Sequence, residues 1–212
     1  MQDKYTGIDI FSVENIPLYS ESCQQGCVVA FDTETTGLHN HDDIVQLAWV
    51  VMENGLTTRA DYTYVRNLSV PIDGTEAQQV NGLSDAYLAL QGREPKEVYS
   101  RFFWMLKTYA ENHGRVVLVA HNLAFDLRML QNNMMRYGRE GETLLDLNQE
   151  GLVIGCDTRD FAKSLGLPAR ILPNHKLETC IQAFALDATN SHDALDDTKA
   201  CLELFKFLAK ED

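Results

Sequence analysis

Long hydrophobic runs are absent from this 212-residue chain, and positively charged side chains are scarce. No segment approaches the roughly 20 consecutive apolar residues that a membrane-spanning helix requires. Charged residues interrupt the short apolar runs of the first 25 positions, so these positions lack the apolar core of a secretory signal. We therefore expect a cytoplasmic protein that does not enter a membrane.

Cysteines are few, odd in number and unevenly spaced: Cys23, Cys27, Cys156, Cys180 and Cys201. A disulfide framework uses paired cysteines in an oxidising compartment, so this pattern predicts free thiols in a reducing one. Cys23 and Cys27 could supply half of a zinc site, but no second pair of cysteines or histidines follows at a matching spacing. We do not expect structural zinc.

Acidic residues dominate the charge, with 31 Asp and Glu against 18 Lys and Arg and a net charge of -13. This balance disfavours tight, sequence-independent coating of duplex DNA, because phosphate binding relies on Lys and Arg. Carboxylates that hold divalent cations would nevertheless create a local site that attracts phosphate. The composition is compatible with a protein that grips only the end of a nucleic-acid strand.

The length and the 45% hydrophobic content predict one domain that buries roughly 70% of its unfolded surface. Residues 1–25 lack clear periodicity and are expected to form an N-terminal extension. Residues 26–212 are expected to form the domain. Within it, the polar, glycine-bearing residues 138–151 predict a loop or a small insertion.

Apolar runs predict four buried strands, over residues 27–31, 44–52, 116–120 and 152–156. Asn54-Gly55 is a strong hairpin signal, and Tyr62 and Tyr64 lie in the strand expected after it. Three strands are thus expected first, joined by short turns, and five in all.

Helical spacing of apolar residues predicts five helices, over residues 95–114, 123–138, a segment after 157, 175–184 and 194–209. Asn122 is expected to cap the second of these. Glycines at positions 114 and 138 are expected to end the first two. The order of strands and helices predicts an α/β protein with a five-stranded mixed sheet flanked by helices.

Three acidic segments stand out: FDTETTGL (Phe31 to Leu38), HNLAFDLRML (His121 to Leu130) and HDALDDTKA (His192 to Ala200). Each brings a carboxylate next to an apolar strand or helix, where an uncompensated charge is costly. In open α/β sheets, functional sites gather where strands end and helices begin. The segments therefore predict a shared site in which a divalent metal compensates the acids.

The first two segments also have ordinary interpretations when each is taken alone. Asp32 and Glu34 are two residues apart at a strand end, so both point to the same side of the backbone. Hard oxygen ligands of this kind favour magnesium or manganese, but a solvated turn would also explain the pair. Asp126 lies in the first turn of its helix, where an acid can simply complement the helix dipole.

Geometry distinguishes the acids of the third segment. Asp197 borders the apolar stripe and should face the protein body, whereas Asp196 is turned about 100° away and can pair with Lys199. Asp193 suits a capping role. His192 should lie close to Asp197, and its reference pKa of roughly 6.5 suits proton transfer, although a structural role is the alternative.

Taken together, the segments resemble the motifs of the DnaQ-like 3′→5′ exonucleases, the DEDDh family named after four acids and a histidine. Asp32 and Glu34 match its first motif, Asp126 the second, and His192 and Asp197 the third. Their immediate neighbours also fit the family pattern: Thr35, Thr36, Gly37, Leu38, His121, Asn122 and Phe125.

The resemblance covers about residues 26 to 209 and is closest to the proofreading subunits of bacterial DNA polymerase III, which share the Asp-Thr-Glu-Thr-Thr-Gly strand end. It implies an RNase H-like fold and a two-metal mechanism with Mg²⁺ or Mn²⁺. The implied metal ligands are Asp32, Glu34, Asp126 and Asp197. His192 is implied to take the proton from the attacking water.

The same resemblance implies that nucleoside 5′-monophosphates are released from 3′ ends of single-stranded DNA. It places Leu38 and Phe125 against the terminal bases, where core filling is the alternative, and Thr35 and Asn122 on the terminal nucleotide. Asn81 occupies a place where relatives often have a histidine.

Two rival hypotheses remain at this point. An exoribonuclease of the ribonuclease T or oligoribonuclease type would keep the chemistry and change the substrate to RNA. A non-catalytic nucleic-acid-binding module would keep only the fold, although a scaffold has no need of acids that repel one another. A polymerase or another replication protein, and a second copy of the chain in a homodimer, are the candidate protein partners.

Overall fold

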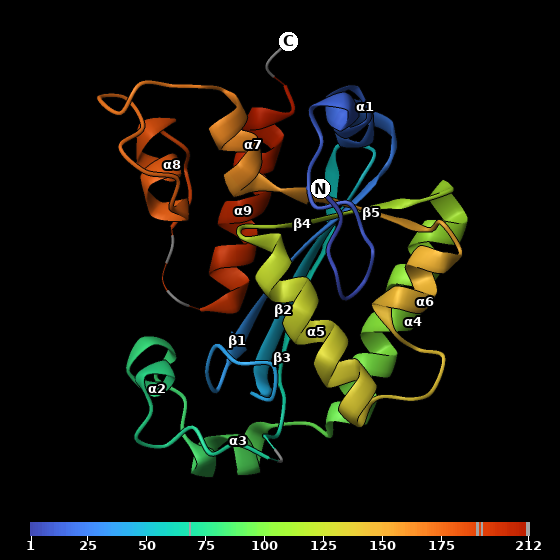
Figure 1. The fold of residues 1–212 in the computed structure, drawn as a ribbon, viewed down its shortest axis with the longest axis vertical. Helices are drawn as coiled ribbons and strands as arrows, with labels where there is room; N and C mark the ends of the chain where they lie inside the picture. Colours follow the sequence, from blue (N-terminus) through green and yellow to red (C-terminus); the bar gives the residue numbers. More distant parts are fainter. Residues whose placement is uncertain (68, 190, 192, 211–212) are drawn as a thin grey trace.

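A five-stranded mixed sheet forms the centre of the computed structural model (Figure 1). The model describes residues 1–67, 69–189, 191 and 193–210. In the order β3-β2-β1-β4-β5, the strands are β1 (Cys27–Thr35), β2 (Ile44–Glu53), β3 (Leu56–Tyr64), β4 (Val116–Ala120) and β5 (Val153–Asp157). The β1–β2 and β2–β3 pairs are antiparallel, and the β1–β4 and β4–β5 pairs are parallel. The predicted fold class is confirmed.

Helices flank both faces of this sheet (Figure 1). In chain order, the helices of the described residues are α1 (Ile16–Gln25), α2 (Glu76–Asn81), α3 (Asp85–Gln91), α4 (Pro95–His113), α5 (Leu123–Tyr137), α6 (Leu144–Gln149), α7 (Thr158–Ser164), α8 (Leu177–Ala183) and α9 (Ala194–Leu208), after a 3-10 turn η1 (Val13–Asn15). Of these, α2 and α3 lie beyond one end of the sheet (Figure 1). None of the helices in the described part of the chain combines the length and the apolar composition of a bilayer span.

Strand β1 supplies side chains to two separate cores because successive residues point to opposite faces of a sheet. Val29 and Phe31 pack into the core built with α4, α5 and α6. Val28 and Ala30 pack into the other core, built with α1, α7, α8 and α9. Continuing this alternation, Asp32 and Glu34 follow the row that faces α9, whereas Thr33 follows the row that faces α5.

The predicted turn residues are confirmed. Asn54 and Gly55 both adopt positive φ, 51° and 81°, as a tight hairpin between β2 and β3 requires. Gly114 ends α4 with φ 77°, a left-handed conformation that glycine adopts at little cost. Gly138 ends α5, where its N–H donates to the carbonyl of Met134.

Two segments without clear periodicity in the sequence contain helices in the structure. Residues 138–151 include the helix α6, which begins with a capping box formed by Thr143 and Asp146. These polar residues suggested a loop, but they satisfy the first N–H groups of the helix. Residues 1–25 include η1 and α1, and the side chains of Ile8 and Tyr19 are completely buried against the sheet.

The first residues form a small hairpin that docks on β5. Gln2 and Asp9 form an antiparallel bridge, and we refer to residues 2–9 as the N-terminal hairpin. The N–H of Asp157 then donates to the carbonyl of Ile10 at 2.8 Å. Gly155 permits this close approach, because a Cβ atom at that position would lie 2.2 Å from the Asp9 carbonyl oxygen.

Replacing Gly155 with valine should therefore displace the N-terminal hairpin from β5. We expect a loss of unfolding free energy of about 1–3 kcal/mol from overpacking, measured by urea denaturation. We also expect faster tryptic cleavage after Lys4. Gly141→Ala is the control. A Cβ atom at position 141 would meet no atom within 4 Å, so this substitution has only the energetic cost of a positive φ. Equal cleavage after Lys4 in wild type and Gly155→Val would contradict the proposed contact.

Candidate active site

The four predicted acids gather where β1 and β4 separate. These parallel strands pair only from Val28 to Ala30 on β1, yet β1 continues to Thr35 alongside β2. Helix α5 begins on one side of this opening and α9 on the other (Figure 1). In open α/β sheets, ligands usually bind beyond the strand ends at such an opening. We refer to this opening between the backbones of β1 and β4 as the crevice.

Three carboxylates converge in this crevice. Asp32 and Glu34 come from the end of β1, and Asp197 comes from the first turn of α9. One carboxylate oxygen from each residue can be chosen so that all three lie within 4.8 Å of one another. The structure thus brings together three of the four acids that the sequence suggests as metal ligands.

The fourth acid, Asp126, lies next to this group and is held from the other side of β1. Its carboxylate is almost fully buried, and its Oδ1 accepts hydrogen bonds from the backbone N–H of Thr33 at 3.2 Å and from the Thr33 hydroxyl at 2.8 Å. Burial, followed by the charge of Asp32, raises the pKa of Asp126 well above its ordinary value. Thr33 therefore fixes Asp126 beside the acid cluster.

Burial and mutual repulsion raise the pKa values of the clustered carboxylates above their ordinary values. Burial first, and then the charges of Asp197 and Asp193, raise the pKa of Asp32 to about 7. Burial and the charges of Asp32 and Asp197 raise the pKa of Glu34 to about 8, against a smaller opposing effect of a hydrogen bond from Asn81. Without a bound cation, these carboxylates would retain protons at a pH where exposed carboxylates release them.

The donor set fits a hard divalent cation. Carboxylate oxygens bind magnesium at about 2.0–2.1 Å, so two oxygens on one ion lie at most about 4.2 Å apart. The three oxygens, which lie within 4.8 Å of one another, would need only a small shift to share a cation. Oxygen donors favour magnesium or manganese over the softer metals that thiolates select. The five cysteines are free and buried. A cation here would also remove the repulsion that raises the pKa values of the acids.

Asp193 caps the helix that carries Asp197, as predicted. Its Oδ1 accepts hydrogen bonds from the backbone N–H groups of Leu195 at 3.0 Å and Asp196 at 3.4 Å. Asp196 points outward and pairs with Lys199 at 3.2 Å, which is also as predicted. Asp197 faces the protein body, with 8% of its surface exposed.

Gln46 links this helix terminus to the sheet. Its Nε2 donates to Asp193 Oδ2 at 3.1 Å, and its Oε1 accepts from the backbone N–H of Ala194 at 3.4 Å. Gln46 pairs with Glu34 across β1 and β2, so both side chains lie on the same face. Sequence reasoning missed this residue, although a lone glutamine within the apolar run of β2 was an available signal.

The segment before α9 is also bonded to the cluster. The backbone N–H of Ser191 donates to Asp197 Oδ1 at 2.9 Å. His192, the predicted general base, lies outside the described residues, so its role stays a prediction.

Asn122 occupies the cap position of α5, but its side chain makes no capping hydrogen bond. The capping prediction is wrong because Asn122 adopts φ 78°, and its own N–H donates to Asp157 Oδ1 at 3.1 Å. Asp157 also accepts from the N–H of Arg159 at 2.9 Å and thereby caps α7. Sequence reasoning also missed this buried aspartate. It holds the backbone of Asn122, and the side-chain amide of Asn122 is exposed.

The three other predicted substrate contacts differ in their environments. Leu38 is 72% exposed, so it does not fill the core. Phe125 is partly buried, with the Arg128 guanidinium 5.3 Å from its ring centroid. Thr35 is buried, and its hydroxyl donates to the carbonyl of Gly37 at 2.6 Å. Leu38 and Phe125 are thus the more accessible of these three.

Two further polar residues support the crevice. Asn81, at the end of α2, donates to the carbonyl oxygen of Thr35 at 3.4 Å. The ring nitrogens of His121 contact the Thr158 hydroxyl and the His175 carbonyl, each at 2.9 Å. Burial lowers the pKa of His121 to about 4, so this histidine is neutral at pH 7 and acts as a structural link.

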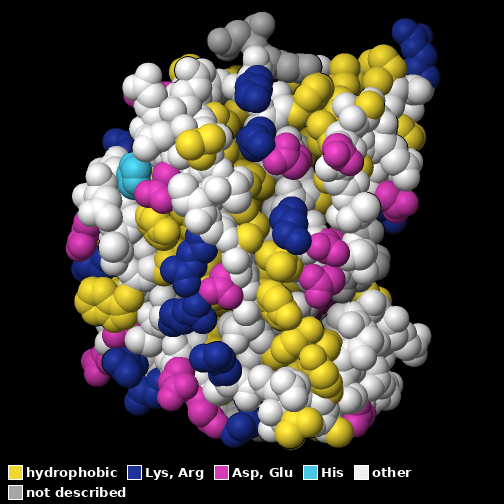
Figure 2. All heavy atoms as spheres, turned by 180° about the vertical axis from the view of Figure 1, so that it is seen from behind, with side chains coloured by type: hydrophobic (Ala, Val, Ile, Leu, Met, Phe, Trp, Pro, Cys, Tyr) yellow, Lys and Arg dark blue, Asp and Glu magenta, His cyan; other side chains and the backbone are white. Residues whose placement is uncertain are grey.

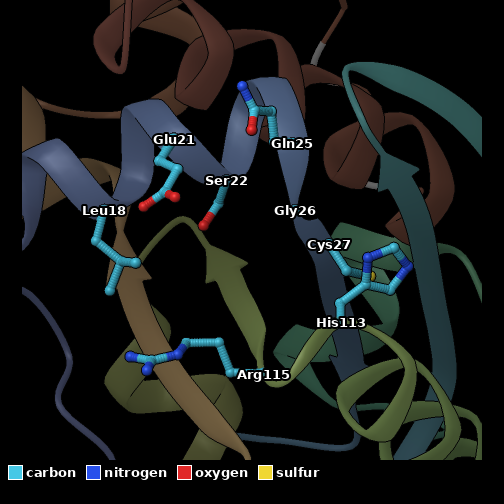
Figure 3. A pocket seen from close by; sticks show the side chains of 8 residues that line it. All are labelled: Leu18, Glu21, Ser22, Gln25, Gly26, Cys27, His113 and Arg115. Atoms are coloured by element: carbon cyan, nitrogen blue, oxygen red, sulfur yellow. The ribbon is translucent and has the colours of Figure 1, made fainter.

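Another hollow, of about 220 Å³, lies at the opposite end of β1 (Figure 3). Cys27 lines it together with Glu21 of α1 and Arg115 before β4. Cys27 and Asp32 are five positions apart, which corresponds to about 16 Å along a strand. This hollow is therefore separate from the acid cluster.

Comparison with known proteins identifies the family of the chain. Residues 29–205 match the model of the RNase T exonuclease family. The chain is 30% identical over 193 residues to the PolC-type DNA polymerase III of Caldanaerobacter subterraneus, covering 90% of this chain and 12% of that relative. It is 29% identical over 178 residues to the DNA polymerase III epsilon subunit of Treponema pallidum, covering 83% of this chain and 73% of that subunit.

The fold is also similar to solved structures. Escherichia coli exonuclease I in complex with a dT13 oligonucleotide superposes with a TM-score of 0.70 at 16% identity, covering 88% of this chain and 41% of that one. This likeness shows the RNase H-like fold. The chain spans only 12% of the length of the PolC-type relative. The family match over residues 29–205 shows that the chain belongs to the RNase T family of exonucleases, and the predicted resemblance to the DnaQ-like exonucleases is confirmed.

Proposed function

We propose that this protein is a metal-dependent 3′→5′ exonuclease that releases nucleoside 5′-monophosphates from single-stranded DNA ends. The observation that carries the proposal is the convergence of Asp32, Glu34 and Asp197 within 4.8 Å at the crevice of an exonuclease-family fold. Acids that repel one another in a metal-free crevice are expensive for a purely structural module. Their presence favours catalysis over the non-catalytic alternative.

The acids would hold two divalent cations, Mg²⁺ or Mn²⁺. Asp32, Glu34 and Asp197 would bind the first, and Asp32 together with Asp126 would bind the second. When bound, such a pair stabilises the charge on the attacking and leaving oxygens of phosphodiester hydrolysis. Gln46 and Asp193 would keep the start of α9 against the sheet, and Thr33 would hold Asp126 in place.

His192 would act as the general base that takes a proton from the attacking water. The pattern His-x-Ala-x-x-Asp, which ends at Asp197, supports this assignment. Proton transfer by a positioned histidine typically contributes 10²- to 10⁴-fold to a rate.

Four residues would bind the end of the strand. The exposed Leu38 and the ring of Phe125 would contact the terminal bases, where stacking is worth roughly 1–3 kcal/mol per base and tolerates any base. The exposed Asn122 amide and Thr35 would anchor the terminal nucleotide. The exposure of Leu38 and Asn122 supports these roles.

DNA is favoured over RNA as the substrate. The relatives in the comparison are DNA polymerase III proteins, and the structural neighbour was solved with a dT13 oligonucleotide. An exoribonuclease of the ribonuclease T type is the second candidate, because the match is to the family of that name. The preference for DNA or RNA depends on which protein groups contact the 2′-hydroxyl of the substrate.

A polymerase is the favoured protein partner. The epsilon subunit of Treponema pallidum and the much longer PolC-type proteins are named as parts of DNA polymerase III. A homodimer is the alternative assembly. The free cysteines support action in a reducing compartment such as the cytoplasm.

Asp32→Asn should abolish exonuclease activity. With magnesium and 5′-labelled strands, the wild type should produce a ladder of single-nucleotide steps on DNA, and the variant should be at least about a thousandfold slower, or about 4 kcal/mol in transition-state stabilisation. Asp196→Asn is the matched control, because this exposed acid pairs with Lys199 outside the cluster. A ladder on RNA alone would move the assignment to an exoribonuclease, and an active Asp32→Asn would refute the mechanism.

His192→Ala should separate proton transfer from metal binding. We expect turnover to fall by roughly 10²- to 10⁴-fold, whereas the thermal stabilisation by Mn²⁺ stays close to that of the wild type. Single-turnover kinetics and melting curves measure the two effects. An equal loss of both would show that His192 acts on the metal site rather than as the base.

Metal-free protein should lose stability as pH rises toward 8. The folded Asp32 and Glu34 keep protons up to pKa values of about 7 and 8, whereas ordinary values are 3.8 and 4.5. The folded state thus binds more protons between these limits, and the unfolding free energy falls with rising pH. Melting temperatures in chelator should show this fall more steeply for wild type than for Asp32→Asn.

The same measurement with magnesium at pH 8 should restore stability to the wild type, because a ligand that binds only the folded state raises its melting temperature. Asp196→Asn should behave like the wild type. A melting temperature that does not change with pH in chelator would contradict the raised pKa values of Asp32 and Glu34. A melting temperature that responds to neither Mg²⁺ nor Mn²⁺ would contradict the proposed metal site.

A further inference from the structure

A groove lies between the N-terminal hairpin and the first turns of α5. It encloses about 490 Å³, within the range of ~300–1,000 Å³ typical of ligand sites. Lys4 and Tyr5 line it from the hairpin, and Asn122, Phe125 and Arg128 line it from α5. The groove therefore begins at two residues assigned above to the terminal nucleotide and leads away from them across the hairpin.

In the lining of the groove, each of two cationic side chains lies beside an aromatic ring. The ammonium group of Lys4 lies 4.8 Å from the centroid of the Tyr5 ring, and the Arg128 guanidinium lies 5.3 Å from that of Phe125. Asp3 also lines the groove, but its Oδ1 accepts the backbone N–H groups of Tyr5 and Thr6 within the hairpin. Cations for phosphates and rings for bases are the two features of single-strand binding surfaces.

This local chemistry differs from that of the face shown in Figure 2. The chain has a net charge of -13, and on the face shown in Figure 2 lysine and arginine side chains lie among acidic ones. A phosphate approaching that face meets charges of both signs. In the groove, it meets Lys4 and Arg128 beside a carboxylate already engaged in hydrogen bonds.

The walls of the groove are tied together by Asn40, in the loop after the first motif. Its Oδ1 accepts from Arg128 Nη1 at 3.1 Å and from the Tyr5 hydroxyl at 3.5 Å. Arg128 Nη2 also donates to the carbonyl of Leu38 at 3.1 Å. The hairpin, α5 and the loop that carries Leu38 thus form one connected surface, which lowers the cost of ordering a bound strand.

We infer that this groove binds the part of a nucleic-acid single strand that precedes its terminal nucleotide. Lys4 and Arg128 contact its phosphates, and Tyr5 and Phe125 stack with its bases. This role rests on the proposed exonuclease function and gives the N-terminal hairpin a part in substrate binding. Strands long enough to reach the hairpin gain affinity that a dinucleotide does not.

The test compares a dT dinucleotide with a dT dodecanucleotide, using initial rates with magnesium. In Lys4→Gln, the ratio of kcat/KM for the long strand to that for the short one should fall about fivefold, as expected for a lost phosphate contact. Lys96→Gln makes the same charge change at an exposed position on α4 and should leave the ratio unchanged. Lys4→Arg should restore it.

Binding supplies a readout that does not need catalysis. Fluorescence anisotropy of the dodecanucleotide on the Asp32→Asn background should show a slope of log affinity against log salt that is smaller by about 0.7 for Lys4→Gln, the value for one phosphate contact with a single strand. Unchanged melting temperatures would show that the hairpin stays folded in the variant.

The outcomes separate the two proposals. If the wild type cleaves both strands and Lys4→Gln matches Lys96→Gln in rate ratio and salt slope, the groove assignment is overturned and the exonuclease stands. If nothing is cleaved, the exonuclease proposal fails, and the anisotropy alone decides on the groove. An Arg variant that behaves like the Gln variant would also count against a phosphate contact.

Discussion

The mutual repulsion of carboxylates at the end of β1 is the constraint on which the rest of the site depends. Asp32 and Glu34 must point the same way because they are two residues apart in a strand, and Asp197 joins them from α9. The fold holds these charges together through contacts on both faces of the sheet, with Thr33 bonded to Asp126 on one and Gln46 to Asp193 on the other. A divalent cation bound there would relieve the repulsion.

Much of this arrangement could be predicted from short-range geometry. Strand alternation placed Asp32 and Glu34 on one side, and the 100° step of a helix separated the inward Asp197 from the outward Asp196. The apolar runs and turn residues predicted all five strands and their mixed pairing. These features depend on periodicity and on motifs confined to a few residues, which a sequence displays directly.

Other features depend on contacts between residues far apart in the chain. Asp157 accepts a hydrogen bond from the backbone N–H of Asn122, whose side chain does not make the expected capping bond. The sequence around Asn122 gives no sign of this contact. Gln46 lies 147 residues from Asp193, its hydrogen-bond partner. The cap residues of α6 are also turn formers, so the sequence predicts a loop or a small insertion where this short helix forms. Tertiary contacts, rather than local preference, decide these positions.

The central claim is that the acids at the end of β1 form a site for divalent cations. Anomalous diffraction from a crystal of the protein grown with Mn²⁺ tests it most directly. Strong manganese peaks bounded by Asp32, Glu34 and Asp197, with a neighbouring peak beside Asp126, are the predicted result. Carboxylates that remain together without a manganese peak, or that separate into different surroundings, would contradict the account.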